Sequence, residues 1–464
     1  MAQASTYFYD SNDADRQTLH RRITPSDAQY DEQEARWNLL ADFIKPKLAE
    51  TSGYPIRSWL QGSYKFGTQV RPVHTGDEFD IDLGVYYCWS GSSNDGDFGP
   101  KELKTMVQDT LKEFEAENDD VVEVLEPPKM RCCRIRFRGG FHIDVPCYHL
   151  DEQRDARALA IEDDSWEDSD PKAIYKWFTS QFDDYTRSRV RRLVRYMKAW
   201  AALKFRDDQD RPSSVLLTVL VAQAVYGLDG GLPVPEDEAL KVVLCKVYET
   251  AFVAQDVRNP VDPDENLASR MNAEQWSAFT DGLKQFSEVA DQAVDAESEV
   301  SACTLWSASF EYLFPLPDAQ TLSEEARQLP ALRTLPEVQV KAVSKDNSNL
   351  RYNGKNEIGP IPKNCNISFR VSNADRMPYG TNFYWMVRNE GDEAEDINDL
   401  GHKAGQGIEA TEHSAYNGTH YMDCTAVAGG RIIGVRRVRV RINSFVAPKR
   451  NPPKPAWTKI KGRR

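Results

Sequence analysis

Residues 79–87 read Phe-Asp-Ile-Asp-Leu-Gly-Val-Tyr-Tyr, and the alternation at the start of this stretch predicts a strand. In a strand, residues two positions apart point to the same face, so the carboxylates of Asp80 and Asp82 project side by side. Two carboxylates held this close repel each other unless a cation lies between them. Mg²⁺ is the natural candidate, because it prefers oxygen ligands and commonly joins carboxylates to substrate phosphates. The stretch therefore predicts a divalent cation site.

A third carboxylate follows at Asp144, within the short apolar stretch His142–Pro146 that we expect to form a neighbouring strand. An isolated Asp-x-Asp is most often a solvated pair, but a carboxylate flanked by aliphatic residues needs a polar or ionic partner. Together, Asp80, Asp82 and Asp144 are suited to hold two metal ions about 4 Å apart. The predicted chemistry is in-line nucleotidyl transfer, in which positioning and charge neutralisation supply most of the acceleration.

Four further residues are candidates for holding the triphosphate of a nucleotide. Gly62 lets the backbone approach phosphate oxygens closely, and Ser63 offers a hydroxyl and an amide. Lys198 lies beside the buried face of a predicted helix over 187–205, so its ammonium can reach a cleft, although a lone lysine is most often a surface residue. Ser213 begins the next apolar helix, where it either caps that helix or binds a phosphate.

The chain is too long for one core, and its composition changes along its length. With 464 residues, two or three domains are expected. We divide it into a catalytic lobe with an N-terminal helical arm at 1–170, a helical substrate-binding lobe at 171–335, a small β-rich, sandwich-like domain at 336–446 and a basic flexible tail at 447–464. The predicted fold class is α+β, with a mixed sheet and helices in the first lobe.

Composition excludes several classes of protein. A formal net charge of -14 argues against a general nucleic-acid coat protein. The eight cysteines form no Cys-x-x-Cys pair and no zinc-finger spacing, so reduced thiols in a cytoplasm are the simplest interpretation. No apolar run approaches the length needed to cross a bilayer, and we expect no membrane association.

The order of these motifs resembles that of the polymerase-beta-like nucleotidyltransferases, and more narrowly of the bacterial enzymes related to cyclic GMP-AMP synthase and oligoadenylate synthetase. The matching stretches are Leu60-Gln61-Gly62-Ser63-Tyr64-Lys65-Phe66-Gly67-Thr68, Asp80-Ile81-Asp82-Leu83-Gly84-Val85, His142-Ile143-Asp144-Val145-Pro146, Arg195-Tyr196-Met197-Lys198-Ala199-Trp200, Pro212-Ser213-Ser214-Val215-Leu216-Leu217 and Asn259-Pro260-Val261-Asp262-Pro263-Asp264-Glu265-Asn266-Leu267. They span about residues 55–270, and the set is specific although the Gly-Ser element alone is not.

The resemblance implies an enzyme that joins two or three nucleoside triphosphates, releases pyrophosphate and usually closes the product into a ring that signals phage infection. It implies that Asp80, Asp82 and Asp144 bind two Mg²⁺ ions, with Mn²⁺ as a substitute. It also implies that Gly62, Ser63, Lys198 and Ser213 hold the donor triphosphate of ATP, or of GTP or a pyrimidine nucleotide. The zinc-binding insertion of the animal cyclic GMP-AMP synthases is missing, so activation by duplex DNA is not expected.

The β-rich region, about 338–445, resembles the C-terminal sensor domain fused to some bacterial members of this group. The likeness rests on the stretches 383–394 and 416–421. It implies recognition of a small ligand, a nucleotide or a regulatory partner protein. Four residues could build an aromatic and cationic pocket there, or could equally be a sandwich core and its rim: Trp385, Arg388, His420 and Tyr421.

Two alternatives remain open on the residues alone. A linear-oligonucleotide or RNA-tailing enzyme would use the same chemistry, although the acidic body and the lack of an obvious RNA-binding module argue against processive tailing. A catalytically silent nucleotide sensor would use the same cleft, but binding alone gains little from three clustered acids.

The alternating cations Arg134 and Arg136 predict a basic strand edge near acceptor phosphates, whereas His142 and His149 are taken as structural.

Overall fold

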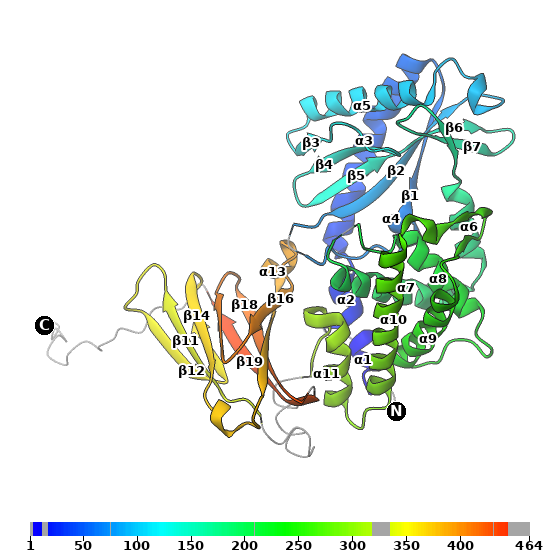
Figure 1. Ribbon diagram of the computed structural model, residues 1–464. Coiled ribbons are helices and arrows are strands. Elements are labelled where there is room, and N and C mark those ends of the chain that lie inside the picture. Colours follow the sequence, from blue (N-terminus) through cyan, green and yellow to red (C-terminus); the bar gives the residue numbers. More distant parts are fainter. Residues whose placement is uncertain are drawn as a thin grey trace, which may run out of the picture. The chain divides into compact units, whose positions relative to one another are not determined.

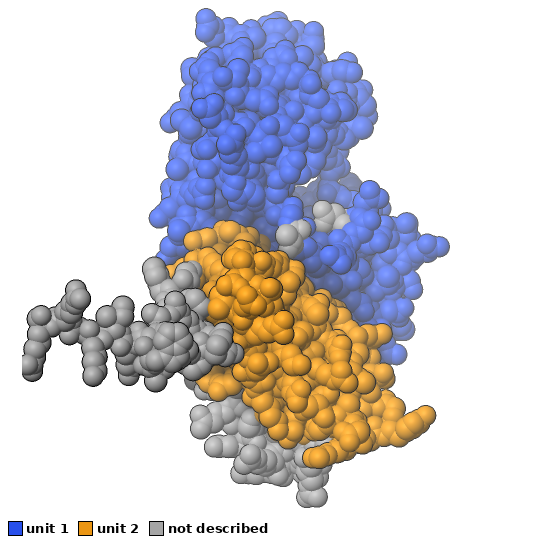
Figure 2. All heavy atoms as spheres, turned by 90° about the vertical axis from the view of Figure 1, so that its left-hand side faces the viewer, with its two compact units in different colours: residues 1–295 blue, residues 296–464 orange. Residues whose placement is uncertain are grey.

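The computed structural model describes residues 3–11, 17–74, 76–207, 209–317, 335–429 and 431–443. The chain forms two compact units, Met1–Asp295 and Ala296–Arg464, which Figure 2 distinguishes by colour. The predicted basic tail at 447–464 lies outside the described residues. Residues 296–317, placed in the helical lobe by the predicted boundaries, group with the second unit.

The first unit begins with three helices, α1 (Ser5–Phe8), α2 (Leu19–Ile23) and α3 (Asp27–Ser52). Ser26 and Gln29 form a capping box that starts α3, and Gly53, with a φ of 74°, ends it. Pro46 lies inside α3, and the helix continues through it to Ser52.

An eight-stranded mixed sheet forms the centre of the first unit (Figure 1), in the order β3-β4-β5-β2-β6-β7-β8, with β1 also pairing with β2. Its strands are β1 (Ile56–Gln61), β2 (Phe79–Cys88), β3 (Val121–Val124), β4 (Cys133–Phe137), β5 (Phe141–Val145), β6 (Cys147–Asp151), β7 (Ala156–Ala160) and β8 (Trp166–Asp168). The Gly-Ser segment forms a short helix, α4 (Gly62–Phe66), directly after β1. The stretch His142–Pro146, expected to be one strand, ends as β5 at Val145, because Pro146 lacks an N–H. Strand β2 therefore pairs first with β5 and then with β6.

One face of this sheet is covered by α3 and α5 (Pro100–Glu117), whose apolar side chains share a core with the inward residues of the strands. Ile81, Leu83 and Val85 of β2 belong to that core and are essentially inaccessible to solvent. Because alternate residues of a strand face opposite sides, Asp80 and Asp82 must lie on the other face. The helical core thus leaves the charged face of the sheet available for a site.

The rest of the first unit is mainly helical. Its elements are α6 (Pro171–Ser180), α7 (Asp184–Lys204), α8 (Ser214–Tyr226), α9 (Glu236–Val253), the paired strands β9 (Arg258–Asn259) and β10 (Asp262–Asn266), η2 (Leu267–Arg270) and α10 (Ala273–Val294). Helices α7, α8, α9 and α10 pack in sequence order, each on the next. Among the described residues, no helix combines the length and apolarity needed to cross a bilayer.

The second unit starts with α11 (Glu299–Phe310) and η3 (Glu311–Leu313) and continues as two β-sheets with a shared core. One sheet has the order β12-β11-β14-β17 and the other β13-β19-β18-β15-β16. The strands are β11 (Val338–Ser344), β12 (Arg351–Lys355), β13 (Glu357–Ile361), β14 (Cys365–Val371), β15 (Asn382–Arg388), β16 (Gly401–Gln406), β17 (Glu409–His413), β18 (Gly418–Ala428) and β19 (Arg431–Ile442). The predicted fold class, α+β followed by a β-rich region, is confirmed.

Candidate active site

Strand register brings the charged residues of β2, β4 and β5 together on one face of the sheet. Parallel pairing of β2 with β5 sets Asp80 opposite His142 and Asp82 opposite Asp144. Antiparallel pairing of β4 with β5 sets Arg134 opposite Asp144. The residues between them, such as Ile81, point into the core. The three carboxylates expected from the sequence therefore lie on neighbouring strands and face the same side.

Asp144 is mostly buried and is held by cations. Arg134 donates two hydrogen bonds to it, from Nε to Oδ1 at 2.5 Å and from Nη2 to Oδ2 at 2.7 Å. Lys129 Nζ lies 3.6 Å from Oδ2. Burial alone would raise the pKa of Asp144, but the hydrogen bonds and charge of Arg134 outweigh it and hold the pKa below its usual range. Arg134 of the predicted basic edge thus orients an acid of the site.

Asp80 is half exposed and contacts an imidazole that the sequence-based prediction treats as structural. His142 Nε2 lies 3.0 Å from Asp80 Oδ1, and His142 Nδ1 hydrogen-bonds to Glu78 Oε2 at 3.0 Å. Arg136 in turn donates to both oxygens of Glu78. The signal for His142 in the sequence is its position two residues before Asp144, on the same strand face.

The ligand atoms of Asp80, His142 and Asp144 all lie within 4.8 Å of one another. Among the residues that the structure describes, this is the only group of three His, Cys, Asp or Glu side chains close enough to share a metal ion. Asp80 and Asp144, two of the three predicted metal ligands, belong to this group together with an imidazole. Asp82, the third carboxylate, is not part of it.

That third carboxylate, Asp82, lies against the Gly-Ser segment. A Cβ atom on Gly62 would lie 1.8 Å from Asp82 Oδ2, so any other residue at this position would displace the carboxylate. Burial raises the pKa of Asp82 well above its usual value, and the negative charges of Asp80 and Asp144 raise it further. Arg134 and Lys198 oppose this only in part. A cation bound beside Asp82 would lower this pKa again, because it favours the charged form of the carboxylate.

Two cavities meet at this site, with volumes of about 460 Å³ and 300 Å³. Ser63, Lys198 and Ser214 line both of them. Asp80 lines the larger cavity and Asp82 the smaller one. The carboxylates and the predicted phosphate-binding residues thus border the same two adjoining spaces.

The cavities differ in chemistry. Cationic side chains on the wall of the larger one are Arg71, Lys129, Arg134, Arg136, Lys198 and Arg211. The smaller one has an apolar and aromatic wall on one side, formed by Phe66, Tyr148, Pro171, Ile174, Trp177, Val215 and Val219. Its polar lining, besides the residues already named, consists of Gln61, Thr68, Ser169, Thr218 and Arg270. Flat rings prefer such walls, and phosphates prefer the cationic ones.

Lys198 is buried and donates from Nζ to the carbonyl and hydroxyl oxygens of Thr68, at 3.2 and 3.3 Å. Burial and the charge of Arg195 lower the pKa of Lys198 to about 7, although Asp80 and Asp82 act in the opposite direction. The helix α7 therefore carries this amine to the point where both cavities meet, as expected from the sequence.

Ser213 has the first of the two roles left open for it. Its Oγ accepts a hydrogen bond from Leu216 N at 3.3 Å and caps α8. The next residue, Ser214, is exposed and lines both cavities, whereas Ser213 lines neither. A serine hydroxyl is thus available at the site, one residue later than predicted.

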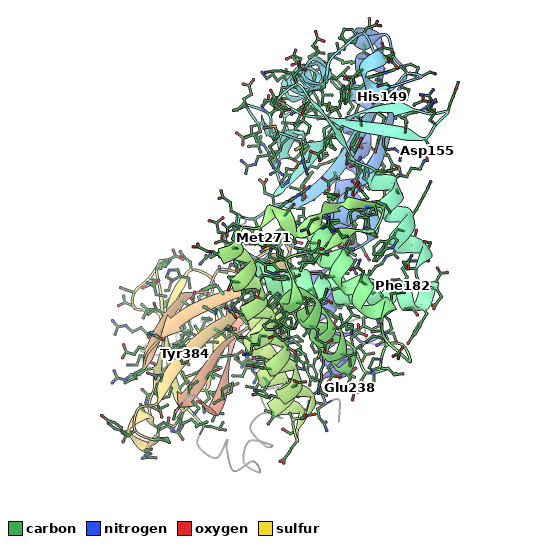
Figure 3. All side chains as sticks on the ribbon, turned by 45° about the vertical axis from the view of Figure 1, so that its right-hand side comes forward. His149, Asp155, Phe182, Glu238, Met271 and Tyr384 are labelled. Carbon is green, nitrogen blue, oxygen red and sulfur yellow. The ribbon has the colours of Figure 1, made fainter. Side chains whose placement is uncertain are left out.

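A third cavity of about 480 Å³ continues from the smaller one through Ser169, Pro171 and Arg270. Its far wall includes Asp155, labelled in Figure 3, and the β9–β10 hairpin. Arg270 lies just before Met271, which Figure 3 also labels. The space next to the carboxylates is therefore large enough to extend well beyond a single triphosphate.

In the second unit, the structure separates the four residues considered for a pocket. Trp385 is buried and donates from Nε1 to Gly407 O at 2.7 Å. Arg388 is equally buried, and its guanidinium bonds Asp423 Oδ2 at 2.5 Å. These two side chains belong to the structural core, but His420 and Tyr421 line a cavity.

Two segments of the chain match known families. Residues 56–148, which carry the Gly-Ser segment and all three acids, match the nucleotidyltransferase domain described as cyclic GMP-AMP synthase DncV-like. Residues 320–443 match the adenylyl/guanylyl and SMODS C-terminal sensor domain. The chain is 28% identical over 430 residues to the cyclic GMP-AMP synthase of Escherichia albertii, covering 91% of this chain and 93% of that protein. Residues 56–148 of the chain are thus similar to the DncV-like nucleotidyltransferases.

The chain also has relatives with different products in their names. It is 27% identical over 245 residues to the c-di-GMP synthase of Roseivirga ehrenbergii, covering 47% of this chain and 61% of that protein. Its fold is similar to that of the Vibrio cholerae di-nucleotide cyclase DncV in complex with GTP and 5MTHFGLU2, with a TM-score of 0.58 and 20% identity. That likeness covers 68% of this chain and 99% of the other, and at this identity it shows the fold alone.

Proposed function

We propose that the chain is a metal-dependent nucleotidyltransferase that joins nucleoside triphosphates into a cyclic di- or trinucleotide and releases pyrophosphate. The observation that carries this proposal is the register of β2 on β5, which sets Asp80 and Asp82 opposite His142 and Asp144 beside two adjoining cavities. The relatives named as cyclic dinucleotide synthases support the product class.

The residues present fit a pair of divalent cations. Asp80 and Asp144 offer oxygen ligands close together, and the Asp82 carboxylate is buried near both of them, where burial first and their negative charges second raise its pKa. We propose that Asp80, Asp82 and Asp144 hold two Mg²⁺ ions, for which Mn²⁺ can substitute. When bound, such ions activate an attacking hydroxyl and stabilise the charge of the leaving pyrophosphate.

Other side chains of the site position the reactants. Arg134 fixes the orientation of Asp144 through two hydrogen bonds, and His142 Nε2 lies 3.0 Å from Asp80 Oδ1 and so limits where that carboxylate can turn. Lys198 and the serine hydroxyls at the junction of the cavities are placed to hold phosphate oxygens by charge and hydrogen bonds. The aromatic wall of the smaller cavity suits a nucleobase, and the cationic wall of the larger one suits the phosphates of a second nucleotide.

The proposal is tested by the products that the purified chain makes. The protein is incubated with ATP, GTP, CTP and UTP in Mg²⁺ or Mn²⁺, treated with phosphatase and analysed by mass spectrometry. Phosphatase-resistant cyclic products support the proposal, and a ladder of linear products would instead support a tailing enzyme. No turnover with any nucleotide or either metal ion would favour a silent sensor.

The matched control is the double variant Asp80→Asn and Asp82→Asn, which keeps the size of both side chains but removes their charge. We expect it to fold and to bind no catalytic metal, so that products fall below detection. Turnover that survives in this variant would show that the carboxylates of β2 do not carry the reaction.

A further inference from the structure

The second unit contains a cavity of about 220 Å³ between its two sheets. The floor of this cavity consists of apolar side chains from both sheets: Ile367, Phe369, Val387, Met422, Val440 and Ile442. Protein cores are normally close-packed, and an engineered cavity of about 150 Å³ already admits benzene. This cavity is larger, and exposed residues such as His413 and Ala415 stand at its border, so it opens to solvent.

The wall above this floor is polar and well ordered by its own hydrogen bonds. Tyr416 donates its hydroxyl to Asp399 Oδ2 at 2.8 Å, and His402 Nε2 lies 2.8 Å from Glu412 Oε1. Asn389 donates from Nδ2 to Asp399 O at 3.0 Å. These contacts hold the side chains in place before any ligand arrives, which lowers the entropic cost of binding.

One carboxylate oxygen of this wall has capacity to spare. Asp399 Oδ2 accepts from Tyr416, but within the described part of the chain no donor is assigned to Oδ1. His420, by contrast, is fully engaged with the backbone, because its Nε2 donates to Tyr416 O at 2.9 Å and its Nδ1 accepts from Glu390 N at 3.4 Å. The open hydrogen-bonding capacity of the cavity is therefore that of an acceptor.

The lining of the cavity contains two carboxylates and three imidazoles. Asp399 and Glu412 are the acids, His402, His413 and His420 are the imidazoles, and no lysine or arginine among the described residues lines the cavity. Glu412 contacts His402 and raises the pKa of this imidazole, so its charge is offset within the pair, whereas Asp399 contacts the hydroxyl of Tyr416. A phosphate or carboxylate beside Asp399 would thus meet negative charge, unlike in the cationic cavity of the first unit.

We propose that this cavity binds a small ring compound that is cationic or uncharged and that donates hydrogen bonds to Asp399. The ring lies on the apolar floor, and the donor group faces the carboxylate at the wall. A nucleotide is disfavoured as the ligand, because its phosphates would find no lysine or arginine among the described lining residues and would lie near Asp399. This inference is independent of nucleotidyl transfer by the first unit.

The test uses three probes that share one ring and differ in charge: benzamidine, benzyl alcohol and benzoate. Binding to the full chain is measured by ligand-detected NMR and calorimetry. We expect benzamidine to bind in the millimolar range or better, and at least about tenfold more tightly than benzoate. Comparable or tighter binding of benzoate would overturn the proposal, as would no binding of either benzamidine or benzyl alcohol.

Two variants, each with a control, test whether the probes bind in this cavity. Ala415→Trp fills its exposed border and is expected to abolish binding, whereas Ser348→Trp, an exposed site outside the lining, leaves it unchanged. Asp399→Asn is expected to weaken benzamidine about tenfold, and Asp375→Asn, an exposed acid elsewhere in the unit, is its charge-matched control. Binding that survives Ala415→Trp would overturn the proposal, and if that variant does not fold, an unchanged affinity of Asp399→Asn would do so.

Discussion

The carboxylate of Asp82 lies so close to the backbone of Gly62 that a Cβ atom on the glycine would stand 1.8 Å from Oδ2. Gly62 also has a φ of +56°, in the left-handed region that other residues rarely adopt. Gly62 begins α4, and both its positive φ and its contact with Asp82 favour a residue without a side chain there. This contact fixes where the third acid of the site can point.

We expect Gly62→Ala to lower the rate of pyrophosphate release about 100-fold, because Asp82 must move by about 1 Å to make room for the methyl group. The measurement is the turnover with saturating nucleotides, together with thermal unfolding to correct for the folded fraction. The added methyl group acts on geometry, so the loss should appear mainly in kcat.

Gly53→Ala is the matched control for this variant. Gly53 has a φ of +74°, but a Cβ atom there would meet nothing within 4 Å. The two substitutions therefore share the backbone cost of about 1 kcal/mol and differ in the contact with Asp82. Equal losses of activity in both variants would show that backbone strain, and not the displaced carboxylate, is responsible.

The period-two pattern of a strand was sufficient to predict that Asp80 and Asp82 share a face, and the apolar setting of Asp144 was sufficient to predict its neighbouring strand. The direction of the Asp82 carboxylate was not predictable in the same way. It depends on the antiparallel pairing of β1 with β2, which sets Gln61 opposite Asp82 and brings Gly62 next to it. A local pattern contains no information on that register.

His142 contacts Asp80 and is itself held by Glu78, so His142 and Glu78 should act as a unit. We expect His142→Asn to lower turnover about 10- to 100-fold, and Glu78→Gln to have a similar effect. Because Glu78 acts through His142, the double variant should be little worse than either single one. The measurement is a double-mutant cycle on kcat/KM.

Glu123→Gln is the control for Glu78→Gln, because it also removes a hydrogen bond from Arg136 but should leave His142 in place. Glu123 Oε1 accepts from Arg136 at 2.7 Å, as Glu78 does, but it makes no contact with His142. We therefore expect Glu123→Gln to retain most of the activity. Strictly additive losses in the cycle, or a Glu123→Gln variant as impaired as Glu78→Gln, would contradict the positioning role.

The sequence did not predict the role of His142, because the role of a histidine two residues from an acid depends on contacts that the sequence does not show. Glu78 precedes β2, and Arg136 lies on β4, so the cluster is assembled from three separate segments. Only the strand order β4-β5-β2 brings these segments side by side. The sequence shows which residue types could form such a network, but it does not show that they come together.

Lys198 is expected to reduce stability while supporting activity. Burial lowers its pKa to about 7, so below that pH the folded protein must carry a buried charge. Between pH 7 and the higher pKa of an unfolded lysine, only the unfolded chain binds the proton, and the stability of the parent protein rises with pH. Lys198→Met removes this dependence.

We therefore expect Lys198→Met to unfold at a higher temperature than the parent at pH 7 without divalent ions, and this advantage should shrink as the pH approaches 10. Turnover should fall, because the variant lacks a cation at the junction of the cavities. The measurements are thermal unfolding over this pH range and pyrophosphate release. A stability difference that does not change with pH would contradict the lowered pKa.

Variants of Ser213 and Ser214 should separate an effect on stability from an effect on the KM for nucleotides. Ser213 caps α8, so Ser213→Ala should cost about 1 kcal/mol of stability and leave the KM for nucleotides nearly unchanged. Ser214 lines both cavities, and Ser214→Ala should raise the KM about tenfold with little effect on stability. Thermal unfolding and steady-state kinetics on the two variants check this. The reverse pattern, with a KM effect confined to Ser213→Ala, would mean that the capping serine turns to the phosphate when a nucleotide binds.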